Sequence, residues 1–227
     1  MIINNTFHFI FVHVPKSAGT SLAHHLSKLS CYCDLEIGGT ELGEAIQPEF
    51  SRRHGLSKHS TAMEIHAVTG DVFWKRYFTF GFVRNPYERS FSIFNFMRKM
   101  SAQKILPYVE IDQFSTFQEF ILSDYYQAEG PDRILCPQFF WLRRNFSSEE
   151  LSVDYVGRVE EIEQNINEIA LRVGQGMQKH EWFDLPQFNR SDCSKRTVWD
   201  ELNERPELKE IIYLKNEVDF RLFGYER

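Results

Sequence analysis

The chain has 227 residues, of which 42% are hydrophobic and 21 are Phe, enough apolar side chain for one folded core. Its formal net charge of −6 argues against general nucleic-acid binding, which requires a basic surface. No window reaches the roughly 18 uninterrupted apolar residues of a membrane span, and residues 1–5 lack the basic region of a signal peptide. We therefore expect a single domain over residues 1–227, with no membrane span and no nucleic-acid partner.

The cysteines are too few and too scattered for a disulfide framework, and none has the spacing of zinc ligands. They are Cys31, Cys33, Cys136 and Cys193. We expect reduced thiols, which favours a cytoplasmic location.

The first informative segment is an apolar run followed by a polar loop. Residues 9–14 predict a buried strand, which ends at Pro15, and residues 16–21 read as a loop that opens a helix. The leucines of that helix share one face: Leu22, Leu26 and Leu29. Such a strand, loop and helix form an anion site, because the first-turn amides and the helix dipole attract negative charge. Lys16 adds a positive charge, and Gly19 lets the backbone approach a ligand.

This loop is not the phosphate loop of nucleoside triphosphatases. That motif places its lysine at the end of the loop, after two glycines. Here Lys16 opens the loop, ahead of Gly19. An ordinary turn between a strand and a helix is the simpler alternative for this segment alone.

A basic run, Arg52-Arg53-His54 continuing to Lys58-His59, precedes the next core strand. It is either a solvated loop or an electropositive rim that steers an anionic substrate.

A second strand and helix follow this run. Residues 77–83 predict a buried strand, Pro86 suits the first turn of a helix, and residues 87–99 are helical in pattern. The helix is expected to bury Phe91, Phe94 and Met97. Arg84 ends the strand and Ser92 lies on the helix, and an arginine fork beside a hydroxyl suits a phosphate dianion. Arg89 is either an anion ligand or a surface ion-pair partner.

The remaining elements alternate between helix and strand. They are a helix over 61–68, a helix over 114–122, a short aromatic helix or turn over 138–142 with Trp141 in the core, a strand over 153–159, a helix over 160–173, a break over 174–180 and a helix over 208–218. This alternation predicts a three-layer α/β/α fold with a central parallel sheet. Among the histidines we expect His13 to be a hydrogen-bonded core residue, and we expect the following to be exposed: His24, His25, His54 and His180.

Two segments resemble the donor-binding motifs of the sulfotransferases. Residues 14–21, VPKSAGTS, resemble their 5′-phosphosulfate loop. Residues 82–92, FVRNPYERSFS, resemble their 3′-phosphate motif, in which a serine follows an arginine after eight residues. The best match is the carbohydrate-type branch, which includes uronyl 2-O-sulfotransferases and bacterial members. Further similar pieces lie at residues 58–62, 137–142, 154–160, 185–191 and 219–225.

The resemblance implies a P-loop-like nucleotide-binding fold and the donor 3′-phosphoadenosine 5′-phosphosulfate (PAPS). The residues it assigns to the 5′-phosphosulfate are Lys16, Ser17, Ala18, Gly19, Thr20 and Ser21, and those for the 3′-phosphate are Arg84 and Ser92. The branch often has Thr-Gly where this chain has Ser17-Ala18. Because Ala18 carries a methyl group, we expect a right-handed or extended backbone at this position. The close approach of the loop backbone to the ligand then depends on Gly19 alone.

The resemblance also suggests a catalytic base. His59 lies in the segment similar to the region that supplies the catalytic histidine of this branch, whereas other branches use a glutamate, for which Glu64 is the candidate. Lys16 would stabilise charge on the leaving phosphate. A sulfuryl group has less charge to neutralise than a phosphoryl group, so we expect no metal requirement.

The resulting hypothesis is sulfuryl transfer from PAPS to a hydroxyl of a carbohydrate or glycolipid. Two alternatives are a P-loop small-molecule kinase that uses ATP and magnesium, and a non-catalytic nucleotide-binding protein. Nucleotide preference distinguishes the kinase, and tolerance to loss of His59 distinguishes the binding protein.

Overall fold

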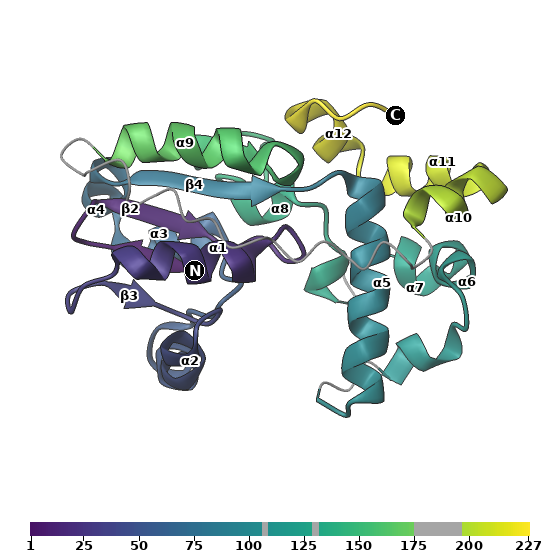
Figure 1. The fold of residues 1–227 in the computed structure, drawn as a ribbon, viewed down its shortest axis with the longest axis horizontal. Helices are drawn as coiled ribbons and strands as arrows, with labels where there is room; N and C mark the ends of the chain where they lie inside the picture. The colour runs from purple at the N-terminus through teal and green to yellow at the C-terminus, as the bar shows by residue number, and fades with distance from the viewer. Residues whose placement is uncertain (106–108, 129–131, 175–196) are drawn as a thin grey trace. The chain divides into compact units, whose positions relative to one another are not determined.

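The computed structural model describes residues 1–105, 109–128, 132–174 and 197–227 (Figure 1). It contains two compact units. The first unit comprises Met1–Val83 and Gln138–Arg190, and the second comprises Arg84–Pro137 and Ser191–Arg227. The expectation of a single domain stays a prediction.

The first unit is built on a five-stranded sheet of order β3-β1-β2-β4-β5. The strands are β1 (Ile2–Asn4), β2 (Phe9–Val12), β3 (Leu35–Glu36), β4 (Phe78–Val83) and β5 (Tyr155–Arg158). As predicted, β2, β4 and β5 are parallel. The sheet is nevertheless mixed, because β1 pairs antiparallel with both β2 and β3. A turn too short for a crossover joins β1 to β2, which permits only a hairpin.

Helices cover both faces of this sheet, which confirms the three-layer fold. On one face, α1 (Gly19–Leu26) and α9 (Ile162–Val173) pack on the sheet. The side chains that form this core include Phe9, Phe11, Phe80, Phe82, Leu22, Leu26, Ile166 and Ile169. On the other face lies α8 (Phe139–Leu142), where a Cβ atom at Gly81 would come within 2.7 Å of Leu142 Cδ2. Gly81 therefore leaves the room that Leu142 fills.

The remaining helical elements of the first unit are α2 (Glu41–His54), α3 (Ala62–Thr69), α4 (Asp71–Arg76) and the 3₁₀ turns Ser27–Leu29 and Val159–Glu161. The sequence pattern did not predict α2. The basic run Arg52–His54 ends this helix, so the expected loop is wrong there. Arg52 and Arg53 are exposed and both form ion pairs with Glu49 one turn earlier, which compensates part of their charge.

The second unit is helical and centres on α5 (Pro86–Ala102) (Figure 1). Asn85 caps this helix by accepting the Tyr87 main-chain N–H, and Pro86 occupies its first turn. Phe94 and Met97 are buried as expected. The other elements are the 3₁₀ turns Val109–Gln113 and Arg133–Leu135 and the helices α6 (Phe117–Leu122), α7 (Asp124–Gln127), α10 (Val198–Glu204), α11 (Glu207–Lys215) and α12 (Glu217–Phe223).

Two helix boundaries in this unit differ from the prediction. α6 begins at Phe117 rather than 114, because the Thr116 hydroxyl caps it by accepting from the Glu119 N–H. The expected last helix over 208–218 is divided at Asn216, whose side chain donates to the Ile212 carbonyl and ends α11.

Several further expectations have a structural outcome. Cys31, Cys33 and Cys136 are free thiols, and His24 and His54 are exposed. His25 is buried at 3% exposure, so its prediction is wrong: it lies three residues after Leu22, on the inner face of α1. Cys193, His180 and residues 175–180 and 185–191 lie outside the described residues. Across the four described ranges, the helices are too short or too polar to traverse a lipid bilayer.

Candidate active site

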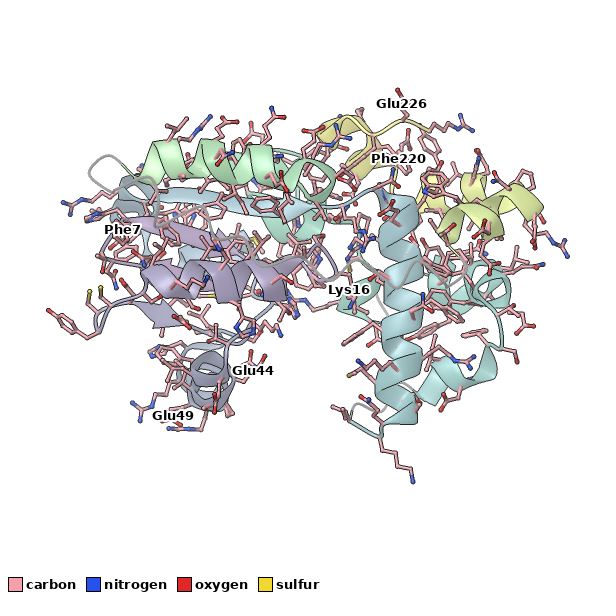
Figure 2. The ribbon with its side chains drawn as sticks, in the orientation of Figure 1. Phe7, Lys16, Glu44, Glu49, Phe220 and Glu226 are labelled. Atoms are coloured by element: carbon pink, nitrogen blue, oxygen red, sulfur yellow. The ribbon has the colours of Figure 1, made fainter. Side chains whose placement is uncertain are left out.

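The loop between β2 and α1 leaves the sheet at its carboxyl edge. The parallel pairing of Val12 with Gly81 places the ends of β2 and β4 at this same edge. Figure 2 labels Lys16 in this loop. α1 has no side-chain cap at Ala18 and no acidic residue in its first turn. Its amide groups and dipole therefore favour an anion at this end, where Thr20 is exposed and Ser21 half-buried.

The backbone of the loop differs from the prediction at Ala18. Its φ of 56° is left-handed, and Lys16 has a φ of 65°, while Ser17 between them lies outside this region. The prediction of a right-handed or extended backbone at Ala18 is therefore wrong. Alternation of left-handed and other residues turns successive N–H groups toward one side and forms an anion-binding concavity. The strain of two left-handed non-glycine residues is consistent with a functional loop.

A hydrogen bond from a distant segment holds this loop. The Ser17 hydroxyl donates to Gln138 Oε1 at 2.8 Å, and both side chains are buried. Gln138 directly precedes α8. The side chain of Ser17, predicted to bind the donor, thus anchors the loop in this structure. The only sequence signal for Gln138 was the resemblance of residues 137–142 to the carbohydrate-type branch.

Gly19 is required by the imidazole ring of His13. A Cβ atom at Gly19 would lie 2.0 Å from His13 Cδ2 and 2.1 Å from Nε2. The close approach predicted for a ligand is therefore occupied on that side by His13. His13 is buried at 2% exposure, as expected, but its Nδ1 atom has no hydrogen-bond partner in the described parts of the chain.

His59 lies against the start of the same loop. Its Nδ1 atom is 2.9 Å from the His13 main-chain oxygen, and the two imidazole rings meet edge to face at 4.7 Å. Nδ1 therefore carries the proton and donates to this carbonyl, which leaves the lone pair on Nε2. Burial lowers the pKa of His59 to about 4, and the charge of Lys58 contributes in the same direction. The imidazole is accordingly neutral at neutral pH.

Glu64, the alternative base, belongs to the cap of α3. Its carboxylate accepts the Thr61 N–H at 2.7 Å, and its own N–H donates to the Thr61 hydroxyl at 3.1 Å. This reciprocal pair is a capping box, which gives Glu64 a role in helix stability.

Arg84 and Ser92 belong to the second unit. Arg84 directly follows the last residue of β4, and its Nε and Nη2 atoms donate to Glu88 Oε2 at 3.0 and 2.8 Å. Ser92 is half-buried on α5, a little more than two turns after Arg84. Because Arg84 is already paired with a carboxylate on the helix that follows it, an incoming phosphate would share the guanidinium with Glu88 or displace it.

Arg89 is a structural residue rather than a surface ion-pair partner. Its side chain is 2% exposed, and the guanidinium donates to the main-chain oxygens of Ile134 and Cys136, both at 3.0 Å. This burial contradicts the surface ion pair, one of the two alternatives from the sequence. Arg89 fixes the segment that leads to Gln138.

A family model described as the sulfotransferase family matches residues 1–226. The chain belongs to the sulfotransferase family. This sulfotransferase is therefore an enzyme of sulfuryl transfer, which uses a sulfonate donor and a hydroxyl-bearing acceptor. In the same comparisons, no curated protein and no solved structure matches it. In the described ranges of this sulfotransferase, no cluster of three or more His, Cys, Asp or Glu side chains is arranged to hold a metal ion.

Proposed function

We propose that this sulfotransferase transfers the sulfuryl group of PAPS to a hydroxyl of a carbohydrate or glycolipid. The observation that carries the proposal is the pairing of His59 with the start of the anion-binding loop. The His13 carbonyl fixes the tautomer of His59, and the loop that follows His13 leads to the uncapped end of α1. A base with an oriented lone pair thus stands next to a site suited to an anion.

The donor would bind through two segments, each assigned from its own motif. The 5′-phosphosulfate is assigned to Lys16 and to the loop and first-turn amides of Ala18, Gly19, Thr20 and Ser21. Left-handed φ angles at Lys16 and Ala18 support this assignment, because they gather N–H groups around one concavity. The 3′-phosphate is assigned to Arg84 and Ser92. This assignment is supported by the position of the Arg84 guanidinium directly after β4 and of the Ser92 hydroxyl on α5.

In the proposed reaction, an acceptor hydroxyl oxygen attacks the sulfur atom in line with the bond to the 5′-phosphate. A new oxygen–sulfur bond forms, the bond from sulfur to the phosphate oxygen breaks, and the hydroxyl proton passes to His59 Nε2. The leaving phosphate gains one negative charge, which Lys16 and the α1 amides stabilise. A bound polyanionic donor favours the imidazolium form, so it raises the pKa of His59 above its value of about 4 in the ligand-free protein.

The acceptor class rests on the resemblance to the carbohydrate-type branch. The net charge of −6 weighs against a highly sulfated polymer, because like charges repel. An acceptor screen with isotope-labelled PAPS, read by mass spectrometry, tests this assignment across glycans, glycolipids and small hydroxylated metabolites. Sulfation restricted to the small metabolites would contradict the carbohydrate assignment.

The donor is tested separately by calorimetry. We expect 3′-phosphoadenosine 5′-phosphate, the desulfated product of the donor, to bind and ATP to compete weakly. Tight ATP binding without binding of the bisphosphate would instead support the kinase alternative.

A further inference from the structure

The two edges of the His13 ring have different surroundings. The edge formed by Cδ2 and Nε2 faces Gly19, the first residue of α1, where a Cβ atom would lie only 2.0 and 2.1 Å from these atoms. The edge formed by Cε1 and Nδ1 faces Gly39, where a Cβ atom would lie 3.7 and 3.8 Å away. The ring is thus held between two glycines, with Nε2 directed at the end of the helix.

The Nδ1 atom of His13 is buried and finds no hydrogen-bond partner among the residues that the structure describes. The side chain is only 2% exposed, so bulk water does not replace the missing partner of Nδ1. A buried N–H group without an acceptor is costly, so the neutral ring avoids a proton on Nδ1 and carries it on Nε2, at the edge that faces Gly19.

The surroundings of Nε2 indicate which partner is missing. The first turn of α1 offers N–H groups, has no side-chain cap and contains no acidic residue. Lys16 of the same loop is a cation. These groups all donate, and the described chain supplies no acceptor for a proton on Nε2. A bound anion accepts hydrogen bonds from the helix amides and from an Nε2–H group, and the positive charge of Lys16 favours it.

We propose that His13 is a ligand of the donor, and that its Nε2–H group donates a hydrogen bond to the sulfuryl or 5′-phosphate oxygens bound at the start of α1. The identity of the anion rests on the function proposed above. Burial lowers the pKa of His13 well below its usual range, and the charges of His59, Lys58 and Lys16 act in the same direction, so it binds as a neutral imidazole. His13 then serves the site twice: its ring contacts the transferred group, and its carbonyl orients His59.

Calorimetry with two nucleotides tests the contact. 3′-Phosphoadenosine 5′-phosphate carries the 5′-phosphate, and adenosine 3′-monophosphate lacks it. His13→Leu should weaken binding of the bisphosphate by about tenfold or more and leave the monophosphate unchanged. His13→Gln, whose amide nitrogen can replace Nε2, should stay within about threefold of wild type. His25→Gln is the matched control, because it changes another buried histidine of the same unit near the far end of α1.

Imidazole nitrogen NMR on the wild-type protein gives a second readout that requires no variant to fold. We expect the His13 signals to report a proton on Nε2 and to shift on addition of the bisphosphate or of inorganic sulfate, but not of adenosine 3′-monophosphate. A proton on Nδ1, or equal bisphosphate affinity in His13→Leu and wild type, overturns the proposal. A His13 shift with sulfate in a protein that binds no bisphosphate would keep the anion contact and reject the PAPS assignment. If neither anion shifts the His13 signals, both the anion contact and the PAPS assignment are rejected.

Discussion

The Nδ1 atom of His59 lies 2.9 Å from the main-chain oxygen of His13, so the residue that follows β2 sets the orientation of the proposed base. A main-chain acceptor is fixed by the strand itself and does not depend on a side-chain conformation. The lone pair of His59 Nε2 is therefore oriented before any ligand binds, which is the arrangement that general-base catalysis favours.

Removal of the proposed base should abolish most of the turnover and spare nucleotide binding. We expect His59→Ala to lower turnover by a factor on the order of 10² to 10⁴, because a positioned base contributes this much to proton transfer. Calorimetry should give nearly unchanged affinity for 3′-phosphoadenosine 5′-phosphate. The value of kcat/KM should decline as pH approaches the pKa of His59, about 4 in the free enzyme, since protonation removes the lone pair.

Glu64→Ala is the control for this experiment. It should cost about 1 kcal/mol of stability through the loss of the capping box and leave turnover largely intact. Activity in His59→Ala together with an inactive but folded Glu64→Ala would assign the base to the glutamate.

Loss of either proposed donor cation should weaken nucleotide binding. We expect Lys16→Ala and Arg84→Ala each to reduce affinity for 3′-phosphoadenosine 5′-phosphate by more than about tenfold, because each removes a charge-assisted hydrogen bond worth about 1.5–3 kcal/mol. Arg53→Ala is a suitable control, since Arg53 is exposed at the end of α2 and paired with Glu49. Near-wild-type affinity in both site variants would reject the assigned donor site.

Exchanging glycine and alanine at neighbouring positions of the loop should have opposite results. Gly19→Ala places a methyl group within 2.0 Å of the His13 ring, and overpacking of this kind costs about 1–3 kcal/mol. Ala18→Gly relieves a left-handed φ of 56°, which offsets the greater backbone freedom of glycine in the unfolded chain. Urea unfolding should therefore give a lower midpoint for Gly19→Ala and little change for Ala18→Gly. Destabilisation of both to the same extent would contradict the contact between His13 and Gly19.

Mild acid should destabilise the fold through its buried histidines. The pKa of His59 is about 4 in the folded protein and 6.5 in the unfolded chain, so between these values the unfolded state binds more protons. The free energy of unfolding should thus fall as pH drops from 6.5 toward 4, and this group should account for about 3 kcal/mol of the loss. Urea midpoints at several pH values measure the slope, and His59→Gln should flatten it. An equally steep slope in that variant would assign the effect to other groups.

Sulfuryl transfer should persist in excess chelator. The sulfuryl group requires less charge neutralisation than a phosphoryl group, and Lys16 with the α1 amides can stabilise the leaving phosphate. Turnover measured with and without a chelator checks this expectation. Complete loss of activity that magnesium restores would contradict it.

The parts of the fold that were predictable have strong local patterns. The apolar runs that became β2, β4 and β5 and the periodic leucines of α1 are of this kind. α2 escaped prediction because it is polar, contains Pro48 and buries little apolar surface. β1 and β3 are three and two residues long, too short for a periodicity.

The strands and helices around the proposed site were predictable, but the detailed geometry of their side chains was not. Alanine disfavours a left-handed backbone, so only tertiary contacts explain the conformation of Ala18. The burial of Arg89 likewise depends on the carbonyls of Ile134 and Cys136, 45 and 47 residues away, which no local pattern reports. Residue type and spacing predicted where these strands and helices lie, whereas long-range contacts determine the conformation and burial of Ala18 and Arg89.

The bond from Ser17 to Gln138 spans 121 residues and has a consequence for biosynthesis. A ribosome adds about 5–20 residues per second, so the partner of Ser17 is made on the order of ten seconds after the loop itself. During that interval the nascent loop lacks its anchor. The loop therefore cannot take its anchored conformation until residue 138 has been made, and a chain released before that residue would lack the anchor.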